Sequence, residues 1–266
     1  MDINKIYNEN CLDTMSRMKD NFIDLTVTSP PYDNLRTYKG FDFDWKATIK
    51  ELYRVTKEGG VVVWVEGDAT VKGSETGTSF KQALFFKECG FNLHDTMIWS
   101  KPNAMPTQST RYQQGFEFMF VFTKGKLKAF NPIKIESKCK GFKVKKHRAK
   151  TDGHNYNEEG YYTVSTEKMI DNVWSIANTK NKTKHKAIFP KQLANDHIIS
   201  WSNEGDLVYD PFMGSGTTMV ASHEVGREAY GMELDPKYCQ VIIDRMQKLD
   251  SSIQVKINGK EYKALL

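Results

Sequence analysis

The chain has 266 residues, of which 39% are hydrophobic and 27% charged, and its formal net charge is +5. This length suits one α/β domain with an inserted lobe and allows a substantial buried core. The sequence has no apolar run long enough to cross a membrane and no hydrophobic region near Met1, so we expect a soluble cytoplasmic protein without a membrane partner.

The four cysteines lie far apart, without a Cys-x-x-Cys pair and without clustered histidines. Zinc sites and disulfide frameworks are usually recognised by closer, regular spacings. We therefore expect no metal site and reduced thiols at Cys11, Cys89, Cys139 and Cys239.

The basic residues are unevenly distributed along the chain. Between residues 134 and 150, eight of seventeen residues are Lys or Arg, and further lysines alternate from residue 180 to residue 186. Such a run favours a polyanionic partner, although a solvated basic loop without a partner has the same composition.

The first half of the chain alternates expected strands with expected helices. Apolar runs predict strands at residues 5–7, 22–27, 61–65 and 93–99. Apolar residues at helical spacing predict a small helix after residue 10 and longer helices at residues 45–56 and 80–88. This alternation is typical of a parallel sheet. The next strand, residues 116–122, has no helix before it, so we expect an antiparallel strand at the edge of the sheet.

Periodicity disappears between residues 131 and 171, where Gly, Asn, Tyr and Lys dominate. This segment is either an inserted recognition element or a mobile surface loop. Order returns with alternating helices and strands, at residues 187–201, 207–209, 217–223, 229–233 and 236–249. Asn258-Gly259 between two short β-prone runs predicts a hairpin near the end of the chain.

A proline-rich turn follows the expected strand at residues 22–27, in the stretch Thr28-Ser29-Pro30-Pro31-Tyr32. Ligands of open α/β sheets bind at this carboxyl end of a strand. The prolines fix φ, exclude helix and leave their carbonyls without a neighbouring N–H. Ser29 and a proline carbonyl could accept the protons of a planar amine while Tyr32 stacks on its ring. The alternative is an ordinary loop.

A glycine-containing turn follows the strand at residues 207–209, in the stretch Asp210-Pro211-Phe212-Met213-Gly214-Ser215-Gly216-Thr217. Glycine lets a ligand approach the backbone closely, and Glu233 at the end of the next strand could accept both hydroxyls of a ribose. These features indicate a cofactor that contains a nucleoside. The dinucleotide fingerprint needs a third glycine where Met219 stands, so S-adenosylmethionine fits better than NAD.

Together, the two motifs resemble those of the DNA amino-methyltransferases, in the order of the permuted beta class. The resemblance implies a Rossmann-like fold with a mostly parallel seven-stranded sheet that contains an antiparallel strand. It also implies S-adenosylmethionine as methyl donor and a flipped base of DNA as acceptor. We expect the catalytic domain at residues 1–130 and 185–250, a target-recognition insertion at residues 131–184, and a hairpin or tail at residues 251–266.

The resemblance assigns roles to individual residues. The catalytic turn would comprise Ser29, Pro30, Pro31 and Tyr32. The cofactor would be held by Asn10, Cys11, Leu12, Phe189, Asp210, Pro211, Phe212, Gly214, Ser215, Gly216, Thr217 and Glu233. Asn10 departs from the acid that is usual in this family. DNA would be bound by Arg36, Lys138, Lys140, Lys143, Lys145, Lys146 and Arg148.

The expected function is methylation of an exocyclic amine in DNA, within a restriction-modification or related DNA-marking system. In the family that the motifs resemble, Ser at the position of Ser29 favours N4 of cytosine, with N6 of adenine as the alternative. A homodimer and a cognate restriction endonuclease are further candidate partners. A non-catalytic nucleic-acid-binding module and an NAD-binding oxidoreductase are alternatives from other classes.

Overall fold

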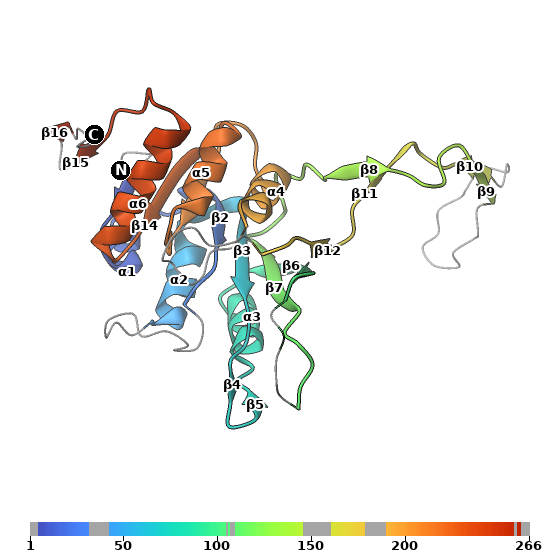
Figure 1. The fold of residues 1–266 in the computed structure, drawn as a ribbon, viewed down its shortest axis with the longest axis horizontal. Helices are drawn as coiled ribbons and strands as arrows, with labels where there is room; N and C mark the ends of the chain where they lie inside the picture. Colours follow the sequence, from blue (N-terminus) through green and yellow to red (C-terminus); the bar gives the residue numbers. More distant parts are fainter. Residues whose placement is uncertain are drawn as a thin grey trace. The chain divides into compact units, whose positions relative to one another are not determined.

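The structure is a computed structural model that describes residues 5–31, 43–104, 106, 110–145, 161–178, 190–257 and 260–261. The chain divides into two compact units (Figure 1). Unit 1 comprises Met1–Asn131 and Asn172–Leu266, and unit 2 comprises Pro132–Asp171. All helices of the described part of the chain belong to unit 1.

One large sheet organises unit 1, and among the described residues it has eight strands. In spatial order they are β1 (Lys5–Tyr7), β14 (Glu228–Met232), β13 (Leu207–Asp210), β2 (Ile23–Thr28), β3 (Thr56–Glu66), β7 (Phe116–Thr123), β6 (Asn92–Ser100) and β12 (Val173–Ser175). Strand β7 runs antiparallel to both of its neighbours, and the other pairs are parallel. The expected mixed α/β sheet is therefore confirmed.

Two details of the expected sheet are wrong. Strand β7 is antiparallel as predicted, but it lies inside the sheet between β3 and β6. The sheet also gains an eighth strand, because Val173–Ser175 pairs with Ile98, Trp99 and Ser100 of β6 and forms the edge. Residues 172–178 consequently belong to unit 1, although the expected insertion extended to residue 184.

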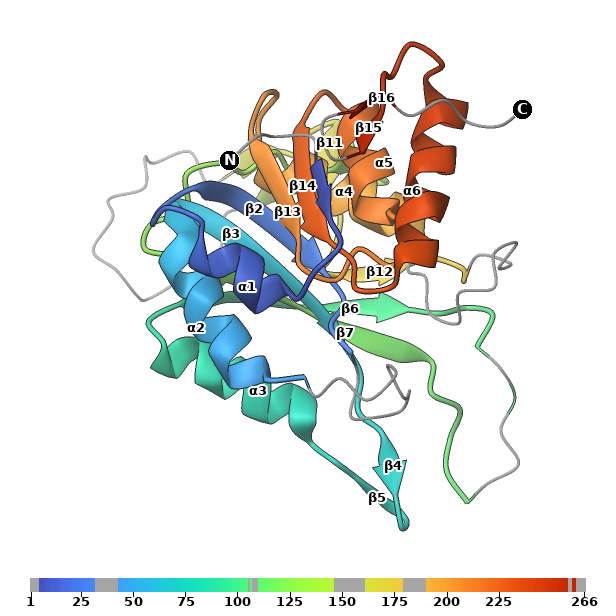
Figure 2. The ribbon, with the colours of Figure 1, turned by 90° about the vertical axis from the view of Figure 1, so that its left-hand side faces the viewer.

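Helices cover both faces of the sheet, as Figure 2 shows. One face carries α1 (Cys11–Ser16), α2 (Trp45–Val55) and α3 (Thr78–Glu88). The other carries α4 (Lys191–Trp201), α5 (Thr217–Glu224) and α6 (Pro236–Leu249). Burial on both faces explains the continuous apolar run in β3, where Val61–Val65 are all buried.

Aromatic residues fill the core between the sheet and the first three helices. Trp64 on β3 and Phe122 on β7 both pack against Phe86 of α3, with ring centroids 5.2 and 4.1 Å away. Tyr209 and Tyr230 continue this core under β13 and β14. Full burial of one large apolar side chain contributes roughly 1.5–3 kcal/mol, so this cluster holds the strand order firmly.

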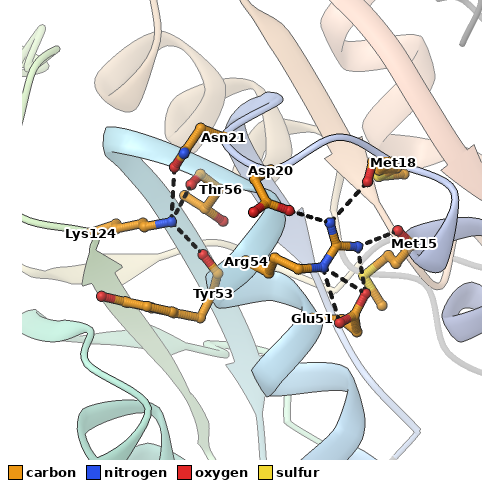
Figure 3. A network of polar contacts seen from close by, with 9 residues as sticks. All are labelled: Met15, Met18, Asp20, Asn21, Glu51, Tyr53, Arg54, Thr56 and Lys124. Atoms are coloured by element: carbon orange, nitrogen blue, oxygen red, sulfur yellow. Dashed lines mark hydrogen bonds and ion pairs between the residues drawn. The ribbon is translucent and has the colours of Figure 1, made fainter.

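Arg54 and Lys124 fasten the amino-terminal edge of the sheet (Figure 3). The Arg54 guanidinium donates to the carbonyls of Met15 and Met18 at 2.6 and 2.9 Å, and so caps the end of α1 from α2. It also pairs with Asp20 and Glu51, and these carboxylates raise its pKa. Lys124, which follows β7, donates to the carbonyl of Tyr53 at 2.7 Å. These bonds link α1, α2 and β7.

The remaining strands of the described residues form short antiparallel pairs. The described part of unit 2 contains two antiparallel pairs, formed by β8 (Lys134–Glu136) with β11 (Glu167–Met169) and by β9 (Lys143–Lys145) with β10 (Tyr161–Thr163). Unit 1 contains two more, formed by β4 (Thr70–Val71) with β5 (Ser74–Glu75) and by β15 (Lys256–Ile257) with β16 (Lys260–Glu261).

Candidate active site

The two sequence motifs leave the sheet from neighbouring strands. Strands β2 and β13 run parallel, with Leu25 opposite Val208 and Thr26 opposite Tyr209. Their carboxyl ends therefore lie at the same edge, where the proline turn begins at Ser29 and the glycine turn at Pro211. Two motifs that lie far apart in the sequence therefore meet at adjacent strand ends.

Asp210 joins the two strand ends through buried hydrogen bonds. Thr28 donates its hydroxyl to one carboxylate oxygen at 2.6 Å, and Thr218 of α5 donates to the other at 2.8 Å. The backbone N–H of Phe212 also donates to Asp210, at 3.0 Å. Burial raises the pKa of this carboxyl, whereas the bonds from Thr28, Phe212 and Thr218 lower it. The acid thus connects the last residue of β2 to the start of the glycine turn.

The glycine turn has a backbone that side chains would strain. Gly214 has φ +52° and Gly216 has φ +77°, both in the left-handed region. A Cβ on Gly216 would lie 2.8 Å from Ile242 of α6. Arg245 of the same helix donates to the Ser215 hydroxyl at 3.0 Å and also to the Ser215 carbonyl. Helix α6 therefore packs against the turn and helps to hold its conformation.

Glu233 follows β14 and reaches the same turn. The Gly214 N–H donates to one of its carboxylate oxygens at 2.8 Å, and the Asp235 N–H donates to the other, also at 2.8 Å. Burial raises the pKa of the Glu233 carboxyl, and these backbone bonds lower it. A half-buried carboxylate beside a left-handed glycine turn fits a nucleoside cofactor, because each oxygen retains a lone pair for a hydroxyl donor.

The segment expected near the cofactor base begins α1. The Asn10 side chain accepts the N–H of Leu12 at 2.9 Å, so Asn10 is the N-cap of this helix. A helix cap is thus the role that the structure gives to the residue that departs from the family pattern. Burial raises the pKa of the Cys11 thiol to about 11, which keeps it neutral at physiological pH.

Part of the proline turn, which the sequence predicts to be catalytic, lies within the described residues. Ser29 and Pro31 are half-buried and Pro30 is buried. Because proline has no N–H, Pro31 cannot donate a local turn bond to the preceding carbonyls. Tyr32, Arg36, Lys146, Arg148 and Phe189 lie outside the described residues.

An aromatic wall stands beside the glycine turn. The Phe212 ring lies 5.1 Å from the ring of Phe43 and 6.4 Å from that of Trp64. Trp64 donates its indole N–H to Gln82 of α3 at 2.7 Å. Phe212 was predicted from the glycine motif, but its aromatic neighbours come from distant segments and have no sequence signal.

The basic side chains of unit 2 that the structure describes lie on its surface. Lys138, Lys140 and Lys143 are exposed, and Lys145 lies in β9. Lys140 pairs with Glu136, and Lys134 lies 3.8 Å from Glu167, so acidic residues neutralise part of the charge.

Two features of the described residues bear on other classes of protein. No group of three or more His, Cys, Asp or Glu side chains is placed there to hold a metal ion. In the same part of the chain, no helix has the length and apolar character needed to span a membrane.

The sequence matches the family model described as DNA methylase over residues 23–244. The orphan methyltransferase M.BamHII of Bacillus amyloliquefaciens is 48% identical over 261 residues, which cover 92% of this chain and 98% of that protein. The Type II methyltransferase M.MthZI of Methanothermobacter thermautotrophicus is 28% identical, over 92% of this chain and 76% of its own.

Solved structures show the same fold. The PvuII DNA methyltransferase, described as cytosine-N4-specific, superposes with a TM-score of 0.70 at 19% identity, covering 95% of this chain and 89% of its own. The Thermus thermophilus protein TTHA0409, solved with S-adenosyl-L-methionine, gives a TM-score of 0.66 at 21% identity, covering 94% and 96% of the two chains. With the family model and the site at the ends of β2 and β13, these findings show that the chain belongs to the S-adenosylmethionine-dependent DNA amino-methyltransferases.

Proposed function

We propose that this DNA methyltransferase transfers the methyl group of S-adenosylmethionine to N4 of a cytosine that has left the duplex. One observation carries the proposal: the Ser29 turn and the glycine turn emerge from adjacent parallel strands, joined by the Thr28–Asp210 hydrogen bond of 2.6 Å. A methyl donor and an amine can meet in line only if their two binding turns are held side by side.

The proline turn supplies acceptors for the amine. Ser29 Oγ and the Pro30 carbonyl would each accept one N–H of the base, and this orients the nitrogen lone pair away from the turn. S-adenosylmethionine, when bound, supplies a methyl group that its sulfonium already activates. As the amine gains positive charge, bonds to these oxygens strengthen, which favours the transition state over the ground state. Stacking of the base on Tyr32 is a prediction from the sequence alone.

The preference for cytosine rests on Ser29. In the family that the motifs resemble, Ser at this position leans towards N4 of cytosine, while Asp or Asn is commoner for N6 of adenine. A hydroxyl accepts a hydrogen bond from one amine N–H without placing a full negative charge against the base. N6-adenine methylation is the second candidate.

The cofactor is assigned to the turn between β13 and α5. We expect Glu233 to accept the ribose hydroxyls beside Gly214, since the two already share a hydrogen bond of 2.8 Å. The backbone of this turn, held in the left-handed region at Gly214 and Gly216, would lie against the methionine part. The same assignment extends to Pro211, Phe212, Ser215, Thr217, Cys11 and Leu12.

Unit 2 is proposed as the target-recognition element. Among its described side chains Ser137 is the only buried one, while Phe142 is 63% and Met169 57% exposed. Two-stranded antiparallel pairs with so little core are marginally stable on their own. Exposed basic side chains suit the phosphates of DNA, and exposed apolar side chains suit contacts with base edges in its grooves. Lys138, Lys140, Lys143 and Lys145 would hold phosphates.

A homodimer belongs to the same proposal. Helix α3 exposes Phe80 (53%) and Leu84 (60%) one turn apart, and Phe80 and Phe116 both contact the Phe118 ring, with centroids 5.4 Å away. Gathered apolar side chains on a surface mark interfaces. Light scattering after gel filtration should give twice the chain mass, and Leu84→Lys should shift it towards the monomer.

We place the reaction in the cytoplasm, within a restriction-modification or related DNA-marking system, with a cognate endonuclease as a candidate partner. Relatives of the chain carry both the names orphan and Type II. A lysate of the source cells that cuts unmodified DNA but spares DNA modified by this protein would support the nuclease. Cutting of both DNAs would contradict it.

Nucleoside mass spectrometry tests the substrate directly. Unmodified DNA is incubated with the protein and S-adenosylmethionine carrying a labelled methyl, then digested. We expect labelled N4-methylcytosine. Labelled N6-methyladenine would replace cytosine by adenine in the proposal, and a label on carbon 5 of cytosine would contradict amine methylation.

A further inference from the structure

The Asp210 carboxylate lies on the seam between β2 and β13, and only 2% of the residue is exposed. One oxygen accepts from Thr28 and from the Phe212 N–H, and the other accepts from Thr218. The Thr218 hydroxyl also lies 3.3 Å from the carbonyl oxygen of Val27 on β2. The hydrogen bonds of this acid are thus divided between the strand that leads to Ser29 and the turn assigned to the cofactor.

We propose that Asp210 is a positioning residue that sets the distance between the amine-binding turn and the cofactor turn. It acts through Thr28 on the Ser29 side, and through Phe212 and Thr218 on the glycine side. This inference rests on the proposed function, because it assigns to Asp210 an effect on methyl transfer.

The surroundings of Asp210 differ from those of a cofactor ligand. Its oxygens face protein donors inside the sheet edge, whereas Glu233 is half-buried and meets the glycine turn from the outside. The sequence placed both acids at the cofactor. The structure divides their work: Glu233 borders the cofactor turn, and Asp210 aligns it with the neighbouring strand.

The Thr28–Asp210 hydrogen bond would affect the rate of methyl transfer through the alignment of the two turns. Thr28 directly precedes Ser29, so a change in the Thr28–Asp210 hydrogen bond moves the amine acceptors relative to the glycine turn. Catalytic groups need to be held within about 0.5 Å of the productive geometry. A misplacement of about 1 Å can lower the rate on the order of 100-fold, even when each molecule still binds.

The chain offers a matched control at the other end of the same two strands. Asp24 of β2 accepts the N–H of Leu207, the first residue of β13, at 3.1 Å, and it pairs with Lys57 at 2.6 Å. Asp24 therefore also links β2 to β13, but at their amino ends. A change there weakens the same strand pair without touching the turns.

The experiment compares Asp210→Ala, Thr28→Val and Thr28→Ser with Asp24→Ala. Thr28→Val keeps the shape of the side chain and removes only the hydroxyl, so it remains informative if Asp210→Ala does not fold. Each variant is measured for kcat and KM with DNA, for the Kd of S-adenosylmethionine by calorimetry, and for Tm. All assays are run below the lowest Tm.

A positioning role predicts a loss in kcat that binding does not share. We expect Thr28→Val to lower kcat by about 10-fold and Asp210→Ala by up to about 100-fold. For Thr28→Val, the Kd of S-adenosylmethionine should stay near that of the unmodified protein, and Thr28→Ser should restore most of kcat. Asp24→Ala should lower Tm and leave kcat near its original value.

Two results would overturn the inference. One is an unchanged kcat in Thr28→Val, and the other is a fall in kcat in Asp24→Ala equal to that in Asp210→Ala. Both results are judged against the unmodified protein, which must itself methylate DNA. If the unmodified protein itself transfers no methyl group, the proposed function fails, and the inference fails with it.

Discussion

At the residue scale, Glu233 has the charge state that matters most for the cofactor. Burial raises the pKa of its carboxyl above the usual value for glutamate. The native state therefore holds this proton more tightly than the unfolded chain, so ionisation of Glu233 lowers stability as pH rises through the raised pKa. A ribose hydroxyl needs the ionised form as acceptor. Cofactor binding and stability consequently respond to pH in opposite directions.

The first prediction concerns this pH dependence. Affinity for S-adenosylmethionine should fall on acidification at pH values above the ordinary range of a glutamate carboxyl. Glu233→Gln should bind about 10-fold more weakly, since a bond to a charged acceptor contributes about 1.5–3 kcal/mol, and its affinity should not vary over this range. Calorimetry across pH measures both. The exposed Glu204→Gln is the control, and an unchanged acid limb in Glu233→Gln would contradict the assignment.

Sequence reasoning identified residues that belong to a recognisable motif and missed the long-range hydrogen bonds that support them. Ser29, Gly216 and Glu233 stand at fixed spacings from a strand end, so their places could be predicted. The clamp of Arg245 on Ser215 spans 30 residues, and the bond from Thr28 to Asp210 spans 182. Bonds of this kind depend on which strands become neighbours, which local patterns do not encode.

At the scale of elements, the turn between β13 and α5 depends on Gly216 for two separate reasons, its backbone conformation and its packing against α6. Gly216 has φ +77° and faces Ile242, whereas Gly205 has φ +80° with nothing within 4 Å of the position that a Cβ would take. Both need the left-handed conformation, but only Gly216 of this pair also needs the space.

The second prediction separates these reasons. Gly205→Ala should lower the free energy of unfolding by about 1–2 kcal/mol, the cost of a left-handed L-residue. Gly216→Ala should lose a further 1–3 kcal/mol or so, because its methyl group would crowd Ile242. Urea unfolding measures both variants. Equal losses would show that the packing against α6 does not matter.

The third prediction concerns the network in Figure 3. Arg54→Met should lower the free energy of unfolding by about 1–3 kcal/mol, because the carbonyls of Met15 in α1 and of Met18 just after this helix lose a charged donor. The side chain is 29% exposed, so solvent reduces the share of its ion pairs. Arg54→Lys keeps the charge but not the planar fork, and it should recover only part of the loss. Full recovery in Arg54→Lys would contradict the capping role.

Element order was more predictable than sheet order. The strands at β2, β3, β13 and β14 are marked by apolar runs, and the helices between them by their spacing. Strand β7 lies inside the sheet because β6 pairs with the edge of β7 that faces away from β3. The absence of a helix before β7 predicts an antiparallel strand, but it does not predict where that strand lies in the sheet. Strand β12 has three residues in a segment without periodicity, so its pairing with β6 had no local signal.

At the scale of the whole molecule, unit 2 carries the exposed lysines that we assign to DNA. The fourth prediction is that changing Lys138, Lys140 and Lys143 together to Gln weakens DNA binding. The slope of log K against log salt should fall by up to about 0.9 for each phosphate that is no longer neutralised. The matched control changes the exposed Lys19, Lys87 and Lys248 of unit 1 to Gln. An equal change in both triple variants would contradict a specific role for unit 2.

We propose that the two turns on the adjacent strands β2 and β13 form one transfer site. The most direct test is to measure methyl incorporation into DNA and S-adenosylmethionine binding on the same preparation of Ser29→Ala. If the two turns form one site, incorporation should fall to background while the Kd of the cofactor stays near that of the unmodified protein. Full incorporation by Ser29→Ala would contradict it.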